Sequence, residues 1–177
     1  MLNININTFK TKDLTKDKIF LICKIKNSHW VWTVSKQINW FKKNVKKMDI
    51  NNLLSVNNKL VAYNLLRKRK VLQGQKLFNY YYFDTIIILK KWRKKGLGEA
   101  LMKHNNKIID KSKKHAFLIC QKRNVEFYKK YRWKVIPNNK FELMDHKPTW
   151  FNKKDDLIGM VYGLTNNKKK LFYYLKK

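Results

Sequence analysis

Apolar runs separated by short polar turns predict alternating strands and helices along most of the chain. A long apolar and aromatic stretch, 77–89, predicts a strand buried on both faces, and the shorter run 115–120 predicts a second buried strand. Between them, apolar residues at helical spacing predict a helix over 98–112. A helix between two such strands is typical of a parallel pair joined by a crossover connection.

The same patterns predict the remaining elements. Further strands are expected over 18–26, 49–56, 59–66, 133–136 and 140–144, a late hairpin over 159–164 and 171–175, and helices over 29–47 and 125–131. Asn57-Asn58 predicts a tight turn, because asparagine tolerates positive φ. Residues 67–75 are interpreted as a charged connection. This order predicts an α/β fold, with one mixed sheet and helices on both of its faces.

A glycine-bearing turn follows the long strand. It reads Arg93-Lys94-Lys95-Gly96-Leu97-Gly98 and leads into the predicted helix. The first N–H groups of a helix lack intrahelical partners and lie at the positive end of the helix dipole. Gly96 and Gly98 let a ligand approach the main chain without meeting a Cβ, and the neighbouring lysines add positive charge. The turn therefore predicts a site for a phosphorylated ligand.

Two segments carry a resemblance to a known family. Arg-x-x-Gly-x-Gly after an apolar strand resembles the acyl-CoA pyrophosphate loop of the GCN5-related N-acetyltransferase (GNAT) superfamily. Phe127-Tyr128 followed by Trp133 resembles the aromatic–Tyr pair that precedes Gly-Phe in that family, although Arg132 stands where the glycine is usual. The resemblance covers about residues 15–164. It implies a mixed, mostly antiparallel sheet splayed between two parallel strands, with helices on both faces.

The resemblance also implies an activity and its residues. The expected enzyme is an acyl-CoA-dependent N-acyltransferase that moves an acetyl group from acetyl-CoA, a co-substrate, directly to a primary amine. The main chain near Ile86 and Ile88 is expected to pair with the pantetheine arm, and Asn124 with the arm or the loop. Tyr128 is the candidate general acid for the leaving thiolate. The expected diphosphate-binding residues are Arg93, Lys94, Lys95, Gly96, Leu97 and Gly98.

The general base is less constrained. Asp84, the only carboxylate in residues 50–98, is the first candidate, because an unpaired charge in a buried strand is costly and shifts its pKa. An ion pair with one of the many lysines is an equal alternative. His29 is the second candidate, since it falls at the start of the predicted helix 29–47, a segment that borders the acceptor site in the family. Asp145-His146 is the third, and a turn is the more natural interpretation there.

The charge of the chain allows two interpretations. Its formal net charge is +31, from 37 Lys and 5 Arg against 11 acids, and it contains 20 Asn. Proteins that bind phosphates often use arginine for its bidentate geometry. The excess here is lysine and asparagine, which favours codon bias of an AT-rich genome as the origin of the charge. The alternative function is a basic nucleic-acid- or ribosome-binding protein with a GNAT fold and no catalysis. A nucleic-acid partner stays open but is not favoured.

The remaining composition limits partners and location. Cys23 and Cys120 lie in apolar runs without metal-ligand spacing, which predicts buried free thiols, no metal and a cytoplasmic protein. No apolar run is long enough to cross a membrane, so no membrane partner is expected. The expected partner is an amine acceptor, either a small molecule or a macromolecule, and the expected state is a monomer or homodimer. At 177 residues we expect one acyltransferase-like domain over residues 1–177, with its core at about 15–164.

Overall fold

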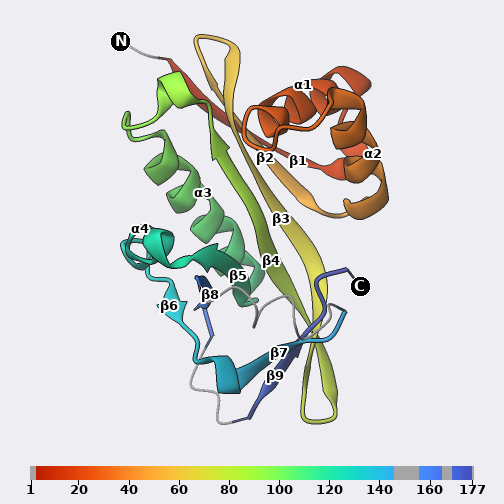
Figure 1. Ribbon diagram of the computed structural model, residues 1–177, viewed down its shortest axis with the longest axis vertical. Helices are drawn as coiled ribbons and strands as arrows, with labels where there is room; N and C mark the ends of the chain where they lie inside the picture. Colours follow the sequence, from red (N-terminus) through yellow and green to blue (C-terminus); the bar gives the residue numbers. More distant parts are fainter. Residues whose placement is uncertain (1–2, 146–155, 165–168, 177) are drawn as a thin grey trace. The chain divides into compact units, whose positions relative to one another are not determined.

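In the residues that the computed structural model describes, 3–145, 156–164 and 169–176, nine strands form one mixed sheet (Figure 1). The helices are α1 Lys16–Asn27, α2 Val34–Asn44, α3 Leu97–Ser112 and α4 Val125–Lys129. The strands are β1 Ile4–Lys10, β2 Ile50–Val56, β3 Lys59–Gln73, β4 Lys76–Ile88, β5 Ala116–Gln121, β6 Lys134–Val135, β7 Phe141–Leu143, β8 Leu157–Tyr162 and β9 Leu171–Tyr173.

The strand order places the predicted parallel pair inside the sheet. Neighbouring strands follow the order β1-β2-β3-β4-β5-β8-β6, and β9 pairs with both β3 and β7. The ladders β1–β2, β2–β3, β3–β9, β5–β8 and β6–β8 are antiparallel. Strand β5 runs parallel to β4, and β9 runs parallel to β7. Helix α3 connects β4 to β5. The predicted mixed, mostly antiparallel sheet with a parallel β4–β5 pair is therefore confirmed.

Two compact units make up the chain. The first comprises residues 1–67 and 84–104, and the second comprises residues 68–83 and 105–177. Strands β3 and β4 and helix α3 contribute residues to both units.

The first unit carries helices on both faces of its strands. Ile87 packs with α1 and α2, whereas its neighbours Ile86 and Ile88 pack with α3. Successive strand residues point to opposite faces, so the two sets of helices cover opposite sides of this part of the sheet. The buried core beneath α1 and α2 includes Ile22, Cys23, Ile25, Phe41, Leu53, Tyr63 and Leu65.

The second unit has an aromatic core. Tyr80, Phe117 and Tyr173 are each completely buried, and the rings of Phe117 and Tyr173 stack with centroids 4.1 Å apart. Aromatic pairs of this kind stabilise a core beyond the area that they bury. Tyr80, Tyr81, Tyr82 and Phe83 of β4 are buried, as the predicted buried strand requires, whereas Leu77 and Phe78 at its start are exposed.

The prediction of a strand over 18–26 was wrong, because this segment forms α1. The helix begins after Thr15, whose hydroxyl accepts a hydrogen bond from the Lys18 N–H at 3.3 Å. Its buried residues recur three and four positions apart, so packing of one helical face outweighs the β-preference of isoleucine. Helix α2 begins later than predicted, after a similar cap at Thr33. Strand β1, an alternating Ile-Asn run, had not been predicted.

The interpretation of 67–75 as a connection was also wrong, because β3 continues to Gln73. Charged residues are accommodated there by specific partners. Arg69 is 1% exposed, and its Nε donates to the Leu175 carbonyl at 3.0 Å. A buried arginine is tolerated where carbonyls accept its donors.

Of two predicted strand connections, the tight turn was confirmed and the late hairpin was not. Asn57 and Asn58 have φ values of 47° and 62°, which confirms the predicted tight turn between β2 and β3. The predicted late hairpin was wrong: β8 pairs with β5 and β6, whereas β9 pairs with β3 and β7. Both segments are strands, but neither alternation nor turn residues identify a strand's partner across the sheet.

Candidate active site

The glycine turn, residues 93–98 between β4 and α3, exposes its main chain. Helix α3 begins at Leu97, and the Gly96 carbonyl accepts a hydrogen bond from the Ala100 N–H at 3.0 Å. Between described residues, no backbone hydrogen bond is donated by the N–H groups of 94–98. Gly96 has a φ of 74°, and a Cβ placed on it would have no atom within 4 Å. The turn thus combines unbonded donors with open space, as an anion site at a helix N-terminus requires.

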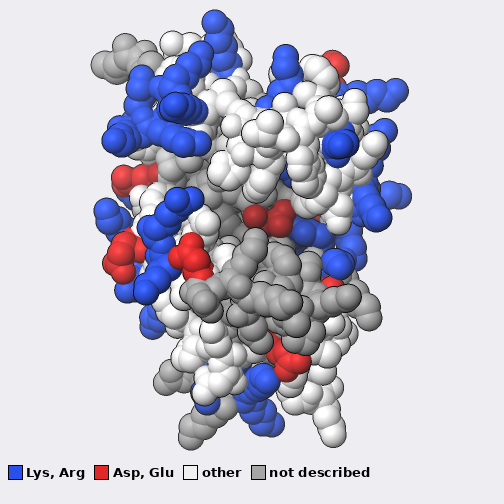
Figure 2. Space-filling model, in the orientation of Figure 1, with Lys and Arg blue, Asp and Glu red and all other residues white. Residues whose placement is uncertain are grey.

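Basic side chains surround this turn. Figure 2 shows them gathered over the segment between β4 and α3. The Arg93 Nε donates to the Ile88 carbonyl at 3.1 Å, which links the turn to the end of β4. Trp92 packs against the same buried cluster as Ile86 and Ile88, and its buried Nε1 has no hydrogen-bond partner among the described residues. The exposed basic residues are Lys90, Lys91, Arg93, Lys94 and Lys95. This charge and these donors fit a diphosphate.

A second concave feature of the first unit is a pocket of about 190 Å³, here named the tryptophan pocket. Its lining residues are Lys26, Trp30, Trp32, Gln37, Trp40, Asp84 and Thr85. Gln37 is 1% exposed; its Nε2 donates to the Trp30 carbonyl at 3.3 Å, whereas its Oε1 has no partner among the described residues. The pocket thus offers aromatic faces and an unused hydrogen-bond acceptor.

Lys26 is the buried cation of the tryptophan pocket. Its side chain lies with Nζ 3.4 Å from the ring centroid of Trp40 and 5.5 Å from that of Trp30, and the residue is 2% exposed. Nζ forms no hydrogen bond with another described residue. Burial lowers the pKa of Lys26 to about 8, although the nearby Asp84 carboxylate favours the charged form. The lowered pKa favours the neutral amine at Lys26 relative to an exposed lysine.

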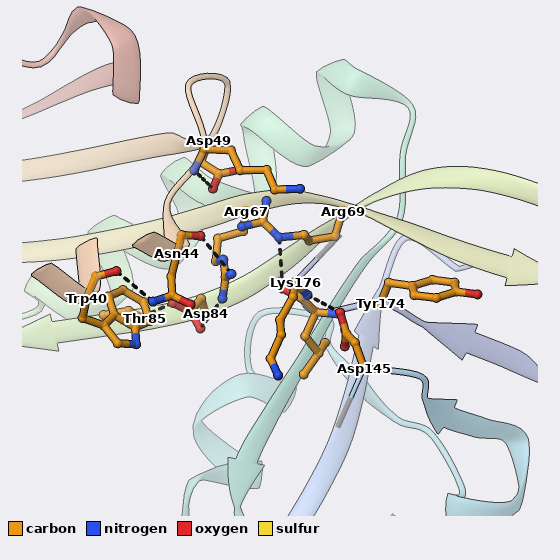
Figure 3. Close-up of polar contacts among 12 residues, drawn as sticks. Trp40, Asn44, Asp49, Arg67, Arg69, Asp84, Thr85, Asp145, Tyr174 and Lys176 are labelled. Carbon is orange, nitrogen blue, oxygen red and sulfur yellow. Dashed lines mark hydrogen bonds and ion pairs between the residues drawn. The ribbon is translucent and has the colours of Figure 1, made fainter. Parts of the chain in front are cut away.

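Asp84 lies in β4 and lines the same pocket. Its Oδ1 is 3.5 Å from Nη1 of Arg67, and the Arg67 Nη2 donates to the Asn44 carbonyl at the end of α2 at 3.0 Å (Figure 3). Thr85 Oγ1 donates to the other carboxylate oxygen at 3.4 Å. The ion-paired alternative that the sequence allowed for Asp84 is therefore observed, with arginine rather than lysine as the partner.

Tyr128 lies in α4 of the second unit, among aromatic rings. Phe83, Phe127 and Trp133 contact it with centroids 6.0, 5.2 and 6.3 Å away. Burial raises the pKa of Tyr128 well above that of an ordinary phenol, and the neighbouring Cys120 adds to the increase. Its hydroxyl forms no hydrogen bond with another described residue. Tyr128 therefore carries a neutral phenol whose proton is not committed to a protein acceptor.

The turn after α4 keeps a left-handed geometry without glycine. Arg132 has a φ of 66°, in the region that favours glycine. Its guanidinium donates to the Tyr162 hydroxyl at 2.6 Å and lies 3.4 Å from the Asp110 carboxylate. These contacts offset the cost of the conformation. Asn124, in the short segment before α4, is exposed, and its side chain does not cap the helix.

The other candidate bases are less well placed. His29 follows the end of α1 instead of beginning a helix, is exposed, and contacts the Trp30 ring edge-on at 4.8 Å. It does not line the tryptophan pocket as the described residues form it. Asp145 lies in a turn, and its carboxylate accepts the N–H groups of Leu175 and Lys176 near the end of the chain. His146 lies outside the described residues.

The structure brings together residues that the sequence analysis did not connect. Asp84 shares its pocket with Lys26, Gln37 and Trp40, none of which had been predicted as a site residue. One signal was available for Lys26. The helix cap at Thr15 would have placed Lys26 on the same helical face as Ile22 and Cys23.

Cys23 and Cys120 are buried free thiols, as predicted, and burial raises the pKa of each to about 11. Within 3–145, 156–164 and 169–176, no group of three or more His, Cys, Asp or Glu side chains could hold a metal ion. None of the helices in these ranges has the length and apolarity needed to cross a membrane.

Comparisons with known proteins agree with this fold and turn. The family described as "Acetyltransferase (GNAT) domain" matches residues 30–144. The chain therefore belongs to the GNAT family of acetyltransferases. No curated protein sequence matches it.

Solved structures of the same fold have little sequence in common with the chain. ElaA from Escherichia coli superposes with a TM-score of 0.63 at 15% identity, covering 90% of this chain and 99% of ElaA. The ribosomal-protein-S18-alanine N-acetyltransferase from Escherichia coli superposes with a TM-score of 0.60 at 16% identity, covering 94% of this chain and 98% of that enzyme. An acyl-CoA N-acyltransferase from Pseudomonas aeruginosa superposes with a TM-score of 0.61 at 13% identity, covering 90% of this chain and 99% of that chain. At such identities the likeness shows the fold alone.

Proposed function

We propose that this protein is an N-acetyltransferase that transfers an acetyl group from acetyl-CoA directly to a primary amine, with residues 1–177 acting as one catalytic domain. The observation that carries the proposal is the glycine turn of a GNAT family member, whose N–H groups from Lys94 to Gly98 have no backbone acceptor among the described residues. Main-chain donors at a helix N-terminus favour a phosphorylated ligand.

Acetyl-CoA supplies an activated acyl thioester, and the chain supplies its binding. Arg93, Lys94 and Lys95 contribute charge to the diphosphate, and the N–H groups up to Gly98 contribute hydrogen bonds. The pantetheine arm pairs with the main chain near Ile86 and Ile88, in the way that an extended ligand adds to a strand, and Asn124 hydrogen-bonds the arm or the turn. The Ile88 carbonyl already accepts the Arg93 Nε, so its second lone pair would serve the ligand.

Proton transfer in this proposal uses two side chains. Asp84, directly or through a water, takes a proton from the acceptor amine in the tryptophan pocket, and Tyr128 donates a proton to the leaving thiolate. The Tyr128 hydroxyl forms no hydrogen bond with another described residue, so its proton is available for this role. His29 is the second candidate base.

The direct test follows free CoA thiol in a mixture of folded protein, acetyl-CoA and one amine at a time. The amines are peptides with a free N-terminal alanine, because one solved structure of this fold is a ribosomal-protein-S18-alanine N-acetyltransferase, and amino sugars. The expected result is thiol release that saturates with acetyl-CoA and requires one class of amine. Absence of acetyl-CoA binding in calorimetry at sub-millimolar concentrations would refute the proposal.

The exposed lysines favour a second candidate, a basic protein that binds nucleic acid without catalysis. Basic side chains cover more of the face in Figure 2 than acidic ones do. Binding of this kind weakens steeply with salt, because each phosphate contact releases counterions. Fluorescence anisotropy with labelled RNA at ~150 mM salt decides this, since a merely lysine-rich surface is largely screened there.

A further inference from the structure

The tryptophan pocket already contains a primary amine of the protein itself. Lys26 lines the pocket with its Nζ against the Trp40 ring, 3.4 Å from the centroid, and without a hydrogen bond to another described residue. The pocket is also the place where Asp84, the candidate base, is accessible. The Lys26 amine therefore shares a cavity with the group proposed to activate an acceptor amine.

The pocket lies along the strand that leads to the glycine turn. Asp84 and Thr85 line the pocket, and the proposed arm-binding residues Ile86 and Ile88 follow in β4. A strand advances about 3.3 Å per residue, so Ile88 and Asp84 are roughly 13 Å apart along β4. An acyl arm that begins at the glycine turn and follows β4 toward Asp84 is thereby directed at the tryptophan pocket.

We propose that Lys26 is a self-acetylation site, where the protein transfers the acetyl group of bound acetyl-CoA to the Nζ of Lys26. This inference rests on the proposed function. The neutral amine attacks the thioester carbonyl; a C–N bond forms and the C–S bond breaks. The amine loses one proton to the base, and the thiolate gains one to become CoA thiol. The products are N-acetyl-lysine at position 26 and free CoA, with no oxidant or metal required.

The surroundings of Lys26 support its reactivity relative to exposed lysines. Burial lowers the pKa of Lys26 to about 8, and the nearby Arg67 lowers it further. Asp84 and Cys23 raise it, but by less than burial lowers it. About a quarter of such amines is neutral at pH 7.5, roughly two orders of magnitude more than for a lysine with a pKa near 10.5. Only a neutral amine can attack a thioester.

The test incubates the full chain with isotope-labelled acetyl-CoA and measures label at each lysine by peptide mass spectrometry. Lys24 is the internal control, since it lies on the same helix, is exposed, and its Nζ also lies over an aromatic ring, that of Phe20. The expected result is labelling of Lys26 at least ~10-fold faster than Lys24, saturating with acetyl-CoA, because a bound thioester acts at high effective concentration. In urea-unfolded protein the two rates should become equal.

Variants and calorimetry separate the outcomes. Lys26→Arg keeps the charge and should remove one labelled site, whereas Lys24→Arg should leave the Lys26 rate unchanged. If acetyl-CoA binds but Lys26 is labelled no faster than Lys24, self-acetylation is refuted while the proposed function stands. If acetyl-CoA does not bind, both are refuted. Rapid labelling that does not saturate also refutes the inference, since it indicates attack on free acetyl-CoA.

Discussion

The glycine turn and the tryptophan pocket lie in the same unit but are built from different atoms. The turn offers main-chain N–H groups, with Gly96 leaving the space beside them open. The pocket offers side chains of Lys26, Gln37 and Asp84 held by aromatic rings. We propose that the turn binds the acyl-CoA donor through main-chain groups, and that the pocket sets the choice of acceptor through its side chains.

The comparison predicts that side-chain chemistry governs rate, while the turn governs donor affinity. Tyr128→Phe should lower kcat by ~10²–10⁴-fold, because it removes a positioned general acid. Acetyl-CoA affinity should stay within ~3-fold, since no donor of the turn changes. Thiol release at saturating acetyl-CoA, beside calorimetry, measures both quantities. Tyr131→Phe, just beyond α4, is the matched control and should keep its rate.

Substitution of a glycine in the turn tests the main-chain site. Gly96→Ala and Gly74→Ala both place a Cβ at positive φ, 74° and 59°, so both should lose ~1–2 kcal/mol of folding stability. In the proposed function, only the Cβ at position 96 enters the space that the donor occupies. Calorimetry should show acetyl-CoA affinity reduced at least ~10-fold in Gly96→Ala and unchanged in Gly74→Ala. Equal affinities in the two variants would remove the glycine turn from the donor site.

The buried charge of the pocket predicts a pH dependence of stability. The Lys26 pKa is lowered from 10.5 to about 8, so between these values the unfolded chain binds more protons than the folded one. The Lys26 contribution to the unfolding free energy should therefore rise with pH over this window, by on the order of 1 kcal/mol per unit. Cys23 and Cys120 contribute with the opposite sign, because burial raises their pKa, so the quantity to measure is the difference between wild type and Lys26→Met. In urea unfolding between pH 8 and about 10, this difference should rise with that slope. The exposed control Lys24→Met should keep the wild-type slope; its loss there would argue against Lys26 as the cause.

The smallest effect concerns the left-handed residue in the turn after α4. Arg132→Gly relieves the strain of a φ of 66° but removes the contacts to Tyr162 and Asp110. The two changes oppose each other, so the unfolding free energy should change by less than about 1 kcal/mol. Urea unfolding measures it. A loss of several kcal/mol would mean that the Arg132 contacts, rather than the turn geometry, dominate at this position.

The difference between a turn built from consecutive residues and a pocket built from distant ones explains which features the sequence could predict. The glycine turn is encoded within eleven residues, from Ile88 to Gly98, so local rules identified it: an apolar strand, glycines and a helix start. The parallel β4–β5 pair followed from the apolar runs on either side of α3. Each of these features depends on neighbours in sequence, which is the information that periodicity and turn chemistry provide.

The tryptophan pocket depends on neighbours in space. Lys26, Gln37 and Asp84 belong to three separate elements, and the first was assigned to a strand because isoleucines dominate its segment. The placement of Arg67 also depends on partners that are distant in sequence. As a charged residue it indicated a connection, but the carboxylate of Asp84 and a carbonyl of α2 allow it to lie buried in β3. No local pattern reports such partners.

Amide NMR titration of the nitrogen-labelled protein with acetyl-CoA reports whether main-chain N–H groups of the glycine turn bind the donor. We expect the largest changes on the N–H resonances of residues 94–98, while those of Gly74 and Gln75, in the turn after β3, do not move. Saturable binding that leaves the resonances of residues 94–98 unchanged would contradict it.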